Sequence, residues 1–220
     1  MTIIISVAQQ KGGAGKTTLS TNITVCLSNL EKKIALIDLD PQKSASMWYD
    51  LRQDYIADNT VDLLLHDYNI HDVLNHHCNK YDVILIDTPP YSKESARKLI
   101  EYSDFVMIPT QLSPMDIWAT QPILDLCRET ETAHFMVLNR VPYASKVSSK
   151  LHETLVENNL PISSTPIGNR NSYVSAFLNG SGVTEAEPKS RSAFEIKSLT
   201  SELLKMTACT KKEFIASAYR

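Results

Sequence analysis

Residues 3–18 read IIISVAQQKGGAGKTT, an apolar run that is followed by a glycine-rich segment. The run Ile3 to Val7 predicts a buried strand, and the residues after the glycines predict the start of a helix. Three glycines within four positions let several backbone N–H groups converge on an anion, toward which the helix points its positive end. Lys16 adds a cation for terminal phosphates, and the Thr17 hydroxyl suits Mg²⁺. This pattern indicates a nucleoside triphosphate site.

Composition narrows the class of protein. The chain has 220 residues, 43% of them hydrophobic, so it can bury one substantial core. Its formal net charge of −3 gives no global basic signature for nucleic acid, so any DNA contact must come from a local patch or from dimerisation. The four cysteines have no CxxC spacing, as in reduced thiols of a cytosolic protein. No stretch approaches the ~20 apolar residues of a membrane span. We expect a cytoplasmic protein.

Strand and helix patterns alternate along the chain. Apolar runs predict strands at 3–7, 33–38, 61–65, 82–87, 104–109, 134–139 and 161–167. Helical spacing predicts the main later helices at 115–129, 146–158, 171–179 and 191–206. This alternation favours an α/β fold, a doubly wound and mostly parallel sheet covered by helices on both faces. We expect a single domain over 1–206 and a C-terminal tail over 207–220.

Three aspartates follow predicted strands. Asp38, Asp40 and Asp87 all lie at the carboxyl ends, where ligands bind in an open parallel sheet. Asp87 ends an apolar strand in the manner of an acid that holds Mg²⁺ directly or through water. Its alternative role is an ordinary cap or turn residue, which the neighbouring phosphate loop makes the weaker interpretation.

The glycine-rich segment departs from the usual phosphate loop, because Gln10 stands where a glycine is expected and Lys11 precedes the glycine pair. KGGAGKTT resembles the deviant Walker A motif of the ParA/MinD ATPases. The resemblance implies that Lys11 reaches the nucleotide of a second subunit. Asp38-Leu39-Asp40-Pro41-Gln42 is similar to the family's switch I, which implies that Asp38 joins the magnesium shell and Asp40 activates the attacking water. A capping role for Asp40 on the following helix stays open.

The resemblance extends over most of the chain. Residues 108–119 are similar to a segment of the small plasmid ParA proteins, and Asn139 ends a strand whose asparagine contacts the nucleotide base in that family. The implied nucleotide-binding residues are Lys11, Gly12, Gly13, Ala14, Gly15, Lys16, Thr17, Thr18 and Asn139. The implied catalytic residues are Lys11, Lys16 and Asp40, and the implied metal ligands are Thr17, Asp38 and Asp87.

The partners also follow from the resemblance. It implies ATP and Mg²⁺ as cofactors, a homodimer on ATP binding, nonspecific DNA contact and a centromere-binding ParB-like protein that stimulates hydrolysis, with nucleoid association. The candidate DNA-contact residues are Arg170, Lys189, Arg191 and Lys197. The alternative is a MinD-like membrane-surface ATPase that positions a division or secretion apparatus, although the weakly amphipathic C-terminal segment favours no stable membrane association. A metabolic enzyme on this scaffold, such as an iron–sulfur reductase component, would need paired cysteines near a dimer axis, which the sequence lacks.

Overall fold

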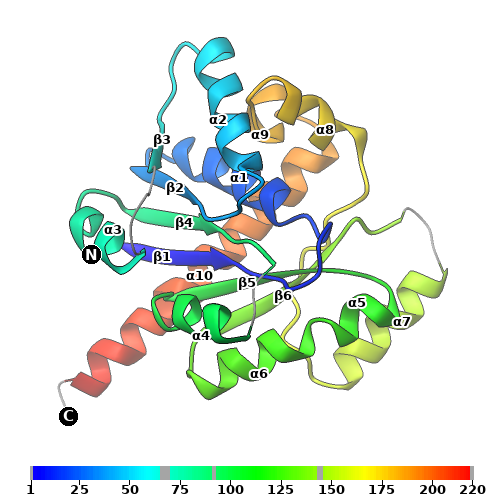
Figure 1. Cartoon of the computed structure of the whole chain (residues 1–220). Coiled ribbons are helices and arrows are strands. Elements are labelled where there is room, and N and C mark those ends of the chain that lie inside the picture. Colours follow the sequence, from blue (N-terminus) through cyan, green and yellow to red (C-terminus); the bar gives the residue numbers. More distant parts are fainter. Residues whose placement is uncertain (1, 65–69, 91–92, 143–145, 219–220) are drawn as a thin grey trace.

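The fold is given by a computed structural model that describes residues 2–64, 70–90, 93–142 and 146–218. Figure 1 shows the strands side by side at the centre of the molecule, with helices around them. Within the described residues, six strands form one parallel sheet in the order β3-β2-β4-β1-β5-β6. The strands are β1 (Ile3–Val7), β2 (Ile34–Asp38), β3 (Val61–Leu64), β4 (Val83–Asp87), β5 (Phe105–Gln111) and β6 (Ala133–Asn139).

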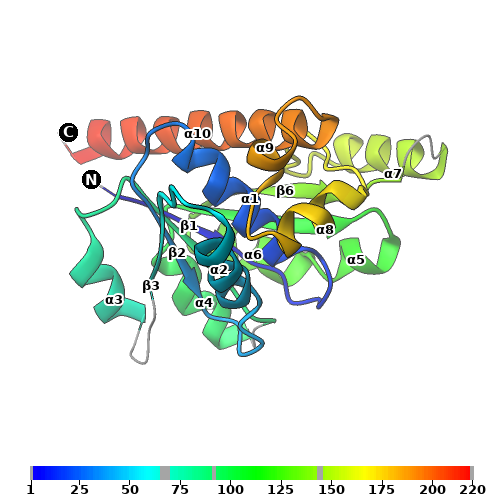
Figure 2. The same ribbon diagram turned by 90° about the horizontal axis from the view of Figure 1, so that it is seen from above.

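Helices cover both faces of this sheet. Figure 2 shows α10 along one side of the strands and α3 and α4 along the other. The helices are α1 (Lys16–Ser28), α2 (Ser44–Tyr55), α3 (Ile70–His77), α4 (Lys93–Glu101), α5 (Pro114–Trp118), α6 (Gln121–Glu129), α7 (Lys146–Glu157), α8 (Asn171–Leu178), α9 (Val183–Ala186) and α10 (Arg191–Ala218). The predicted α/β fold, a doubly wound parallel sheet between two helical layers, is confirmed.

The two faces of the sheet have separate apolar cores. Ile5 and Val7 of β1 pack with α1 and α10 on one face. On the other face, α4 and α6 pack against β5 and β6, while α3 and α4 pack against β2 and β4. Strands β2 and β4 are buried along their whole length, which explains why both read as continuous apolar runs. Within the described residues, no helix is both long and apolar enough to cross a bilayer.

The segment 161–167 is not the seventh strand that its apolar residues predict. It runs beside β6 and exchanges backbone hydrogen bonds with it, Met136 N–H to Pro161 O at 2.6 Å and Ile167 N–H to Leu138 O at 2.8 Å. Only an isolated bridge, Met136 to Ile162, forms within this segment. Pro161 and Pro166 have no N–H group to donate, so a continuous ladder cannot form.

Two helix boundaries also differ from those predicted. The expected helix 115–129 is divided into α5 and α6, and Pro122 lies in the first turn of α6, where a missing N–H does no harm. The last helix was expected to end near 206, but α10 continues to Ala218. Residues 207–218 therefore extend a helix, and the domain limit at 206 stays a prediction.

The order of the strands creates the place for a site. From β1 the chain moves to β2 and β3 on one side and later to β5 and β6 on the other. The loops that leave β1 and β5 therefore diverge at the carboxyl end of the sheet, which is where ligands bind in this architecture.

Candidate nucleotide site

The loop between β1 and α1 has the backbone of a phosphate cradle. Gly13 and Gly15 have φ values of +76° and +93°, in the left-handed region that favours glycine. A Cβ atom on Gly15 would lie 2.1 Å from the Asn139 amide nitrogen, so both the conformation and the space require glycine there. Gln111 Nε2 donates to Gly13 O at 3.1 Å and holds the loop from β5. The loop leads directly into α1, whose first-turn N–H groups face an incoming anion.

Lys16 and Thr17 begin α1 and meet Asp87 at the end of β4. Thr17 Oγ1 donates to Asp87 Oδ2 at 2.7 Å, and Ser20 Oγ donates to Oδ1 at 3.1 Å. Asp87 is fully buried, and this burial together with the charge of Asp38 raises its pKa to about 7, against the hydrogen bonds from Thr17 and Ser20. Burial lowers the pKa of Lys16, while Asp87 and Asp40 act to raise it. The partly buried Thr17 hydroxyl, the buried Asp87 carboxylate and the buried Lys16 thus lie together beside the loop.

Asp38 and Asp40 have different partners at the end of β2. Asp38 is opposite Asp87 in the register of β2 with β4. Its Oδ2 accepts hydrogen bonds from Ser46 N at 2.8 Å and Ser46 Oγ at 2.9 Å, so Asp38 caps the first turn of α2. Asp40 is partly exposed, and its Oδ1 accepts from Gln42 N at 2.9 Å. The capping role that stayed open for Asp40 is therefore performed by Asp38.

Lys11 lies beside α5. Its Nζ is 2.8 Å from Asp116 Oδ1, and its side chain is 43% exposed whereas that of Asp116 is 8% exposed. Asp116 also interacts with the Ser113 hydroxyl at the start of α5. Burial would raise the pKa of Asp116, but the hydrogen bonds from Lys11 and Ser113 outweigh it and lower the pKa. The structure thus places Lys11 in an ion pair at the mouth of the loop.

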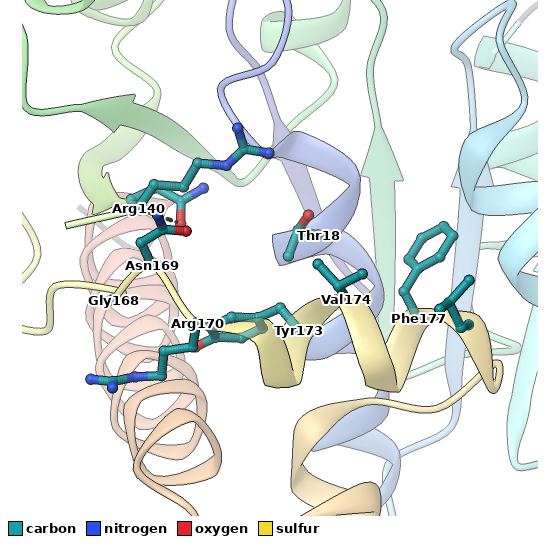
Figure 3. A pocket seen from close by; sticks show the side chains of 10 residues that line it. Thr18, Arg140, Gly168, Asn169, Arg170, Tyr173, Val174 and Phe177 are labelled. Atoms are coloured by element: carbon teal, nitrogen blue, oxygen red, sulfur yellow. Dashed lines mark hydrogen bonds between the residues drawn. The ribbon is translucent and has the colours of Figure 1, made fainter. Parts of the chain in front are cut away.

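A cavity of about 280 Å³ adjoins the loop (Figure 3). Thr18 from α1, Asn139 at the end of β6 and side chains from the 168–178 segment line it. The Asn139 amide donates to Ala14 O at 2.8 Å. Asn139 therefore holds the loop by a hydrogen bond and also lines the cavity. Apolar side chains such as Val174 and Phe177 face polar ones across the cavity, a mixture that suits a flat heteroaromatic ring.

The four candidate DNA-contact residues gather around the start of α10. Arg170 and Arg191 both pair with Glu195, at 2.6 Å and 3.6 Å. Lys197 Nζ donates to Pro188 O at 3.2 Å, and Lys189 lines a shallow depression that Arg191 also lines. Their contact with DNA stays a prediction.

Several residues of the site were missed by the sequence analysis. Ser20 lies three positions after Thr17 on α1, so helical spacing alone could have placed it on the same face. Ser46, Gln111 and Glu195 make contacts between segments far apart in sequence, and no local pattern marks them. Asp116 lies in the segment 108–119, which resembles a segment of the small plasmid ParA proteins. Its ion pair with Lys11 joins residues far apart in the sequence, so no local pattern predicts it.

Sequence comparisons show similarity to a family of AAA domains and to ParA-type proteins. The model of an AAA domain family matches residues 2–79. The chain is 28% identical over 209 residues to the maintenance of carboxysome distribution protein A of Halothiobacillus neapolitanus, covering 91% of this chain and 95% of that protein. It is 24% identical over 195 residues to the protein ParA of Rhizobium radiobacter, covering 84% of this chain and 87% of that one.

Two solved structures show the same fold. An ATP complex of McdA from Cyanothece superposes with a TM-score of 0.75 at 18% identity, covering 92% of this chain and 96% of that one. The Mg-ADP complex of the septum site-determining protein MinD from Pyrococcus horikoshii has a TM-score of 0.73 at 20% identity, covering 96% and 99%. Together, the AAA domain match, the similarity to these relatives and the phosphate loop support a ParA/MinD-type ATPase.

Proposed function

We propose that this protein is a Mg²⁺-dependent ATP hydrolase of the partition kind, whose ATP-bound homodimer binds DNA without sequence preference. A centromere-binding, ParB-like partner stimulates hydrolysis, which resets the cycle and so segregates a plasmid or chromosome. The observation that carries the proposal is the glycine loop, with buried Lys16 beside the hydrogen bond from Thr17 to Asp87. Nucleoid association would follow from DNA binding by the dimer.

The donor set fits ATP and Mg²⁺. Glycines at 13 and 15 leave backbone N–H groups free to surround phosphate oxygens, and Lys16 supplies a fixed positive charge. Thr17, Asp38 and Asp87 offer the hydroxyl and carboxylate oxygens that Mg²⁺ prefers, directly or through water. Mg²⁺ neutralises charge on the phosphates during transfer. The cavity beside Asn139 and Thr18 would take the base.

Asp40 is the residue proposed to act on the attacking water. It is partly exposed just after the carboxyl end of β2, and its carboxylate accepts a hydrogen bond from Gln42 N–H at 2.9 Å. A carboxylate in this position can orient water and accept its proton while the phosphoryl group passes to the oxygen, leaving ADP and phosphate. Lys16 and Lys11 are proposed to stabilise the charge that develops on the phosphate.

A second copy is proposed to complete the site through Lys11. The lysine is 43% exposed and stands at the mouth of the loop, next to α5. Met115 and Trp118 of α5 are 71% and 72% exposed, so large apolar side chains lie beside the ion pair of Lys11 with Asp116. Exposed apolar side chains are typical of protein–protein interfaces, and Lys11 could exchange Asp116 for a group of the second copy. The two features together support a dimer interface at this face.

A second candidate function is positioning of a protein assembly rather than of DNA. It is favoured by the carboxysome distribution protein of Halothiobacillus neapolitanus, which matches the chain over nearly its full length. A MinD-like action at a membrane surface is the alternative that the resemblance left open. These two candidates and the partition function share the same cycle of ATP binding and hydrolysis. They differ in whether the ATP-bound dimer binds a protein assembly, a membrane surface or DNA.

The test measures ATP hydrolysis and co-sedimentation with DNA, with ATP or ADP present. We expect the wild type to bind DNA only with ATP, Lys16→Ala to lose nucleotide binding, and Asp40→Ala to bind ATP and DNA while its hydrolysis falls by at least about a hundredfold. Normal hydrolysis by Asp40→Ala would refute the assigned mechanism. Capture of anionic vesicles without DNA would favour the membrane alternative over partition.

A further inference from the structure

We propose that Glu195 controls the DNA affinity of this protein, because its carboxylate competes with DNA phosphates for Arg170 and Arg191. The inference rests on the proposed DNA-binding function and adds a residue that opposes it. Glu195 lies on α10, and its side chain is 9% exposed. A carboxylate so enclosed keeps the cations it binds, because solvent screens the attraction only weakly.

Glu195 holds Arg170 in a two-point interaction. Arg170 Nη2 lies 2.6 Å from Oε1, and Arg170 Nε lies 3.2 Å from Oε2. This parallel arrangement is the strong form of an arginine–carboxylate pair, and a DNA phosphate would have to displace it to gain the same guanidinium. Figure 3 shows the Arg170 side chain extending from the edge of the cavity toward α10.

The same carboxylate reaches a second candidate DNA contact. Arg191 Nε lies 3.6 Å from Oε1, one helical turn before Glu195, and the Arg191 side chain is 71% exposed. Two of the four candidate cations thus share one buried negative charge. Lys189 and Lys197 lie on the same part of the chain, so the local patch is basic but partly neutralised. Removing this charge while keeping the shape would make both guanidinium groups available to phosphates.

Glu195 also holds the segment that carries Arg170. Gly168 N–H donates to Oε2 at 3.1 Å, and the Tyr173 hydroxyl donates to the same oxygen at 3.4 Å. Gly168, Arg170 and Tyr173 all line the 280 Å³ cavity beside the phosphate loop. Truncation to alanine would therefore release the wall of that cavity as well as the arginines. Glutamine keeps one oxygen acceptor, which can serve Gly168 and Tyr173, and it replaces the other oxygen, which holds Arg170 Nη2, with an uncharged NH2 donor.

The experiment measures DNA affinity by fluorescence anisotropy against NaCl concentration, with ATP present, for wild type and Glu195→Gln. Glu202→Gln is the matched control, because it changes the net charge equally on the same helix. Glu202 accepts hydrogen bonds from the Ser164 backbone N–H and hydroxyl, and within the part of the chain that the structure describes it pairs with no arginine. We expect Glu195→Gln to bind several-fold more tightly than the control, with a salt slope steeper by about 1 for each arginine released.

The outcomes separate this inference from the function beneath it. The double variant Glu195→Gln with Arg170→Gln should lose most of the gain, as expected when the released guanidinium makes the new contact. If the wild type binds DNA and Glu195→Gln matches Glu202→Gln in affinity and slope, the inference on Glu195 is refuted and the proposed function stands. If neither wild type nor Glu195→Gln binds DNA with ATP, both are refuted.

Discussion

At the scale of single residues, the site concentrates charge where water is excluded. Asp87 is fully buried with two hydroxyl donors, from Thr17 and Ser20, and Asp38 faces it across the strand pair. Such an arrangement stores an unfavourable interaction that a bound cation would relieve. The Asp87 carboxylate is therefore suited to binding a metal ion. In the metal-free protein, the same buried charge lowers the free energy of unfolding.

This cost can be measured with Asp87→Asn. In the absence of metal, the folded pKa of Asp87 is about 7, and the unfolded value is about 3.9. The folded state therefore holds the proton more tightly, so stability falls as pH rises from about 4 to about 7 and stays low above that range. We expect Asp87→Asn to unfold at higher urea concentration than wild type, with a larger difference at pH 8 than at pH 5.

The size of this effect has an upper limit of about 4 kcal/mol, from about three pKa units at 1.36 kcal/mol each. Added Mg²⁺ and ATP should stabilise the wild type and not the variant. A variant less stable than wild type at pH 8 without metal would show that the hydrogen bonds from Thr17 and Ser20 outweigh desolvation.

At the scale of elements, α2 is fixed at both ends. Asp38 caps its first turn through Ser46, so a predicted metal ligand also sets where the helix begins. Near its other end, Arg52 is fully buried, forms a two-point pair with Glu185 of α9 at 2.8 and 2.9 Å, and donates to Gly180 O. The helix therefore joins residues 38–42, after β2, to the region before α10.

The Arg52 pair gives a prediction about stability. Glu185→Ala leaves a buried guanidinium without its carboxylate, and we expect this to reduce the free energy of unfolding by about 3 kcal/mol or more. Asp125→Ala removes the partner of exposed Arg128 and should cost less than about 1 kcal/mol. Urea denaturation of both variants checks the contrast, and equal losses would contradict it.

Local pattern was enough for most elements and for the loop. Apolar runs such as Val83 to Asp87 were enough to predict the buried strands. The spacing of the glycines, including those at 13 and 15, was enough to predict the phosphate loop. The sequence could not show that Asp38 caps α2, that Lys11 pairs with Asp116, or that Glu195 holds two arginines. These contacts depend on the register of strands and the packing of α10, which no short window contains. The segment 161–167 shows that a local pattern can also mislead. Its apolar residues predicted a strand, but Pro161 and Pro166 lack the N–H groups that a continuous ladder needs.

At the scale of the whole molecule, the exposed face around α5 leads to a prediction about assembly. Lys11→Ala should bind ATP and remain monomeric in light scattering, because it lacks the charge that we propose reaches the nucleotide of the second subunit. Asp116→Asn is the matched control, since it weakens the hold on Lys11 but keeps a side chain that can contact Ser113. We expect this variant to dimerise at an ATP concentration equal to or below that of wild type.

Dimerisation of Lys11→Ala to the same extent as wild type would show that the lysine is not needed in trans. A loss of dimer in Asp116→Asn would instead show that the ion pair with Asp116 belongs to the assembled interface.

The strip of chain along β6 has a consequence for solubility at high concentration. The Met136 N–H and carbonyl and the Leu138 carbonyl are bonded to the 161–167 strip, and Pro166 has no N–H group. The strip therefore covers this part of the β6 edge and hinders pairing with a strand of another molecule, which is the usual route by which exposed sheet edges aggregate. A filament that this protein builds along this part of β6 would therefore rely on side-chain contacts and not on added strands.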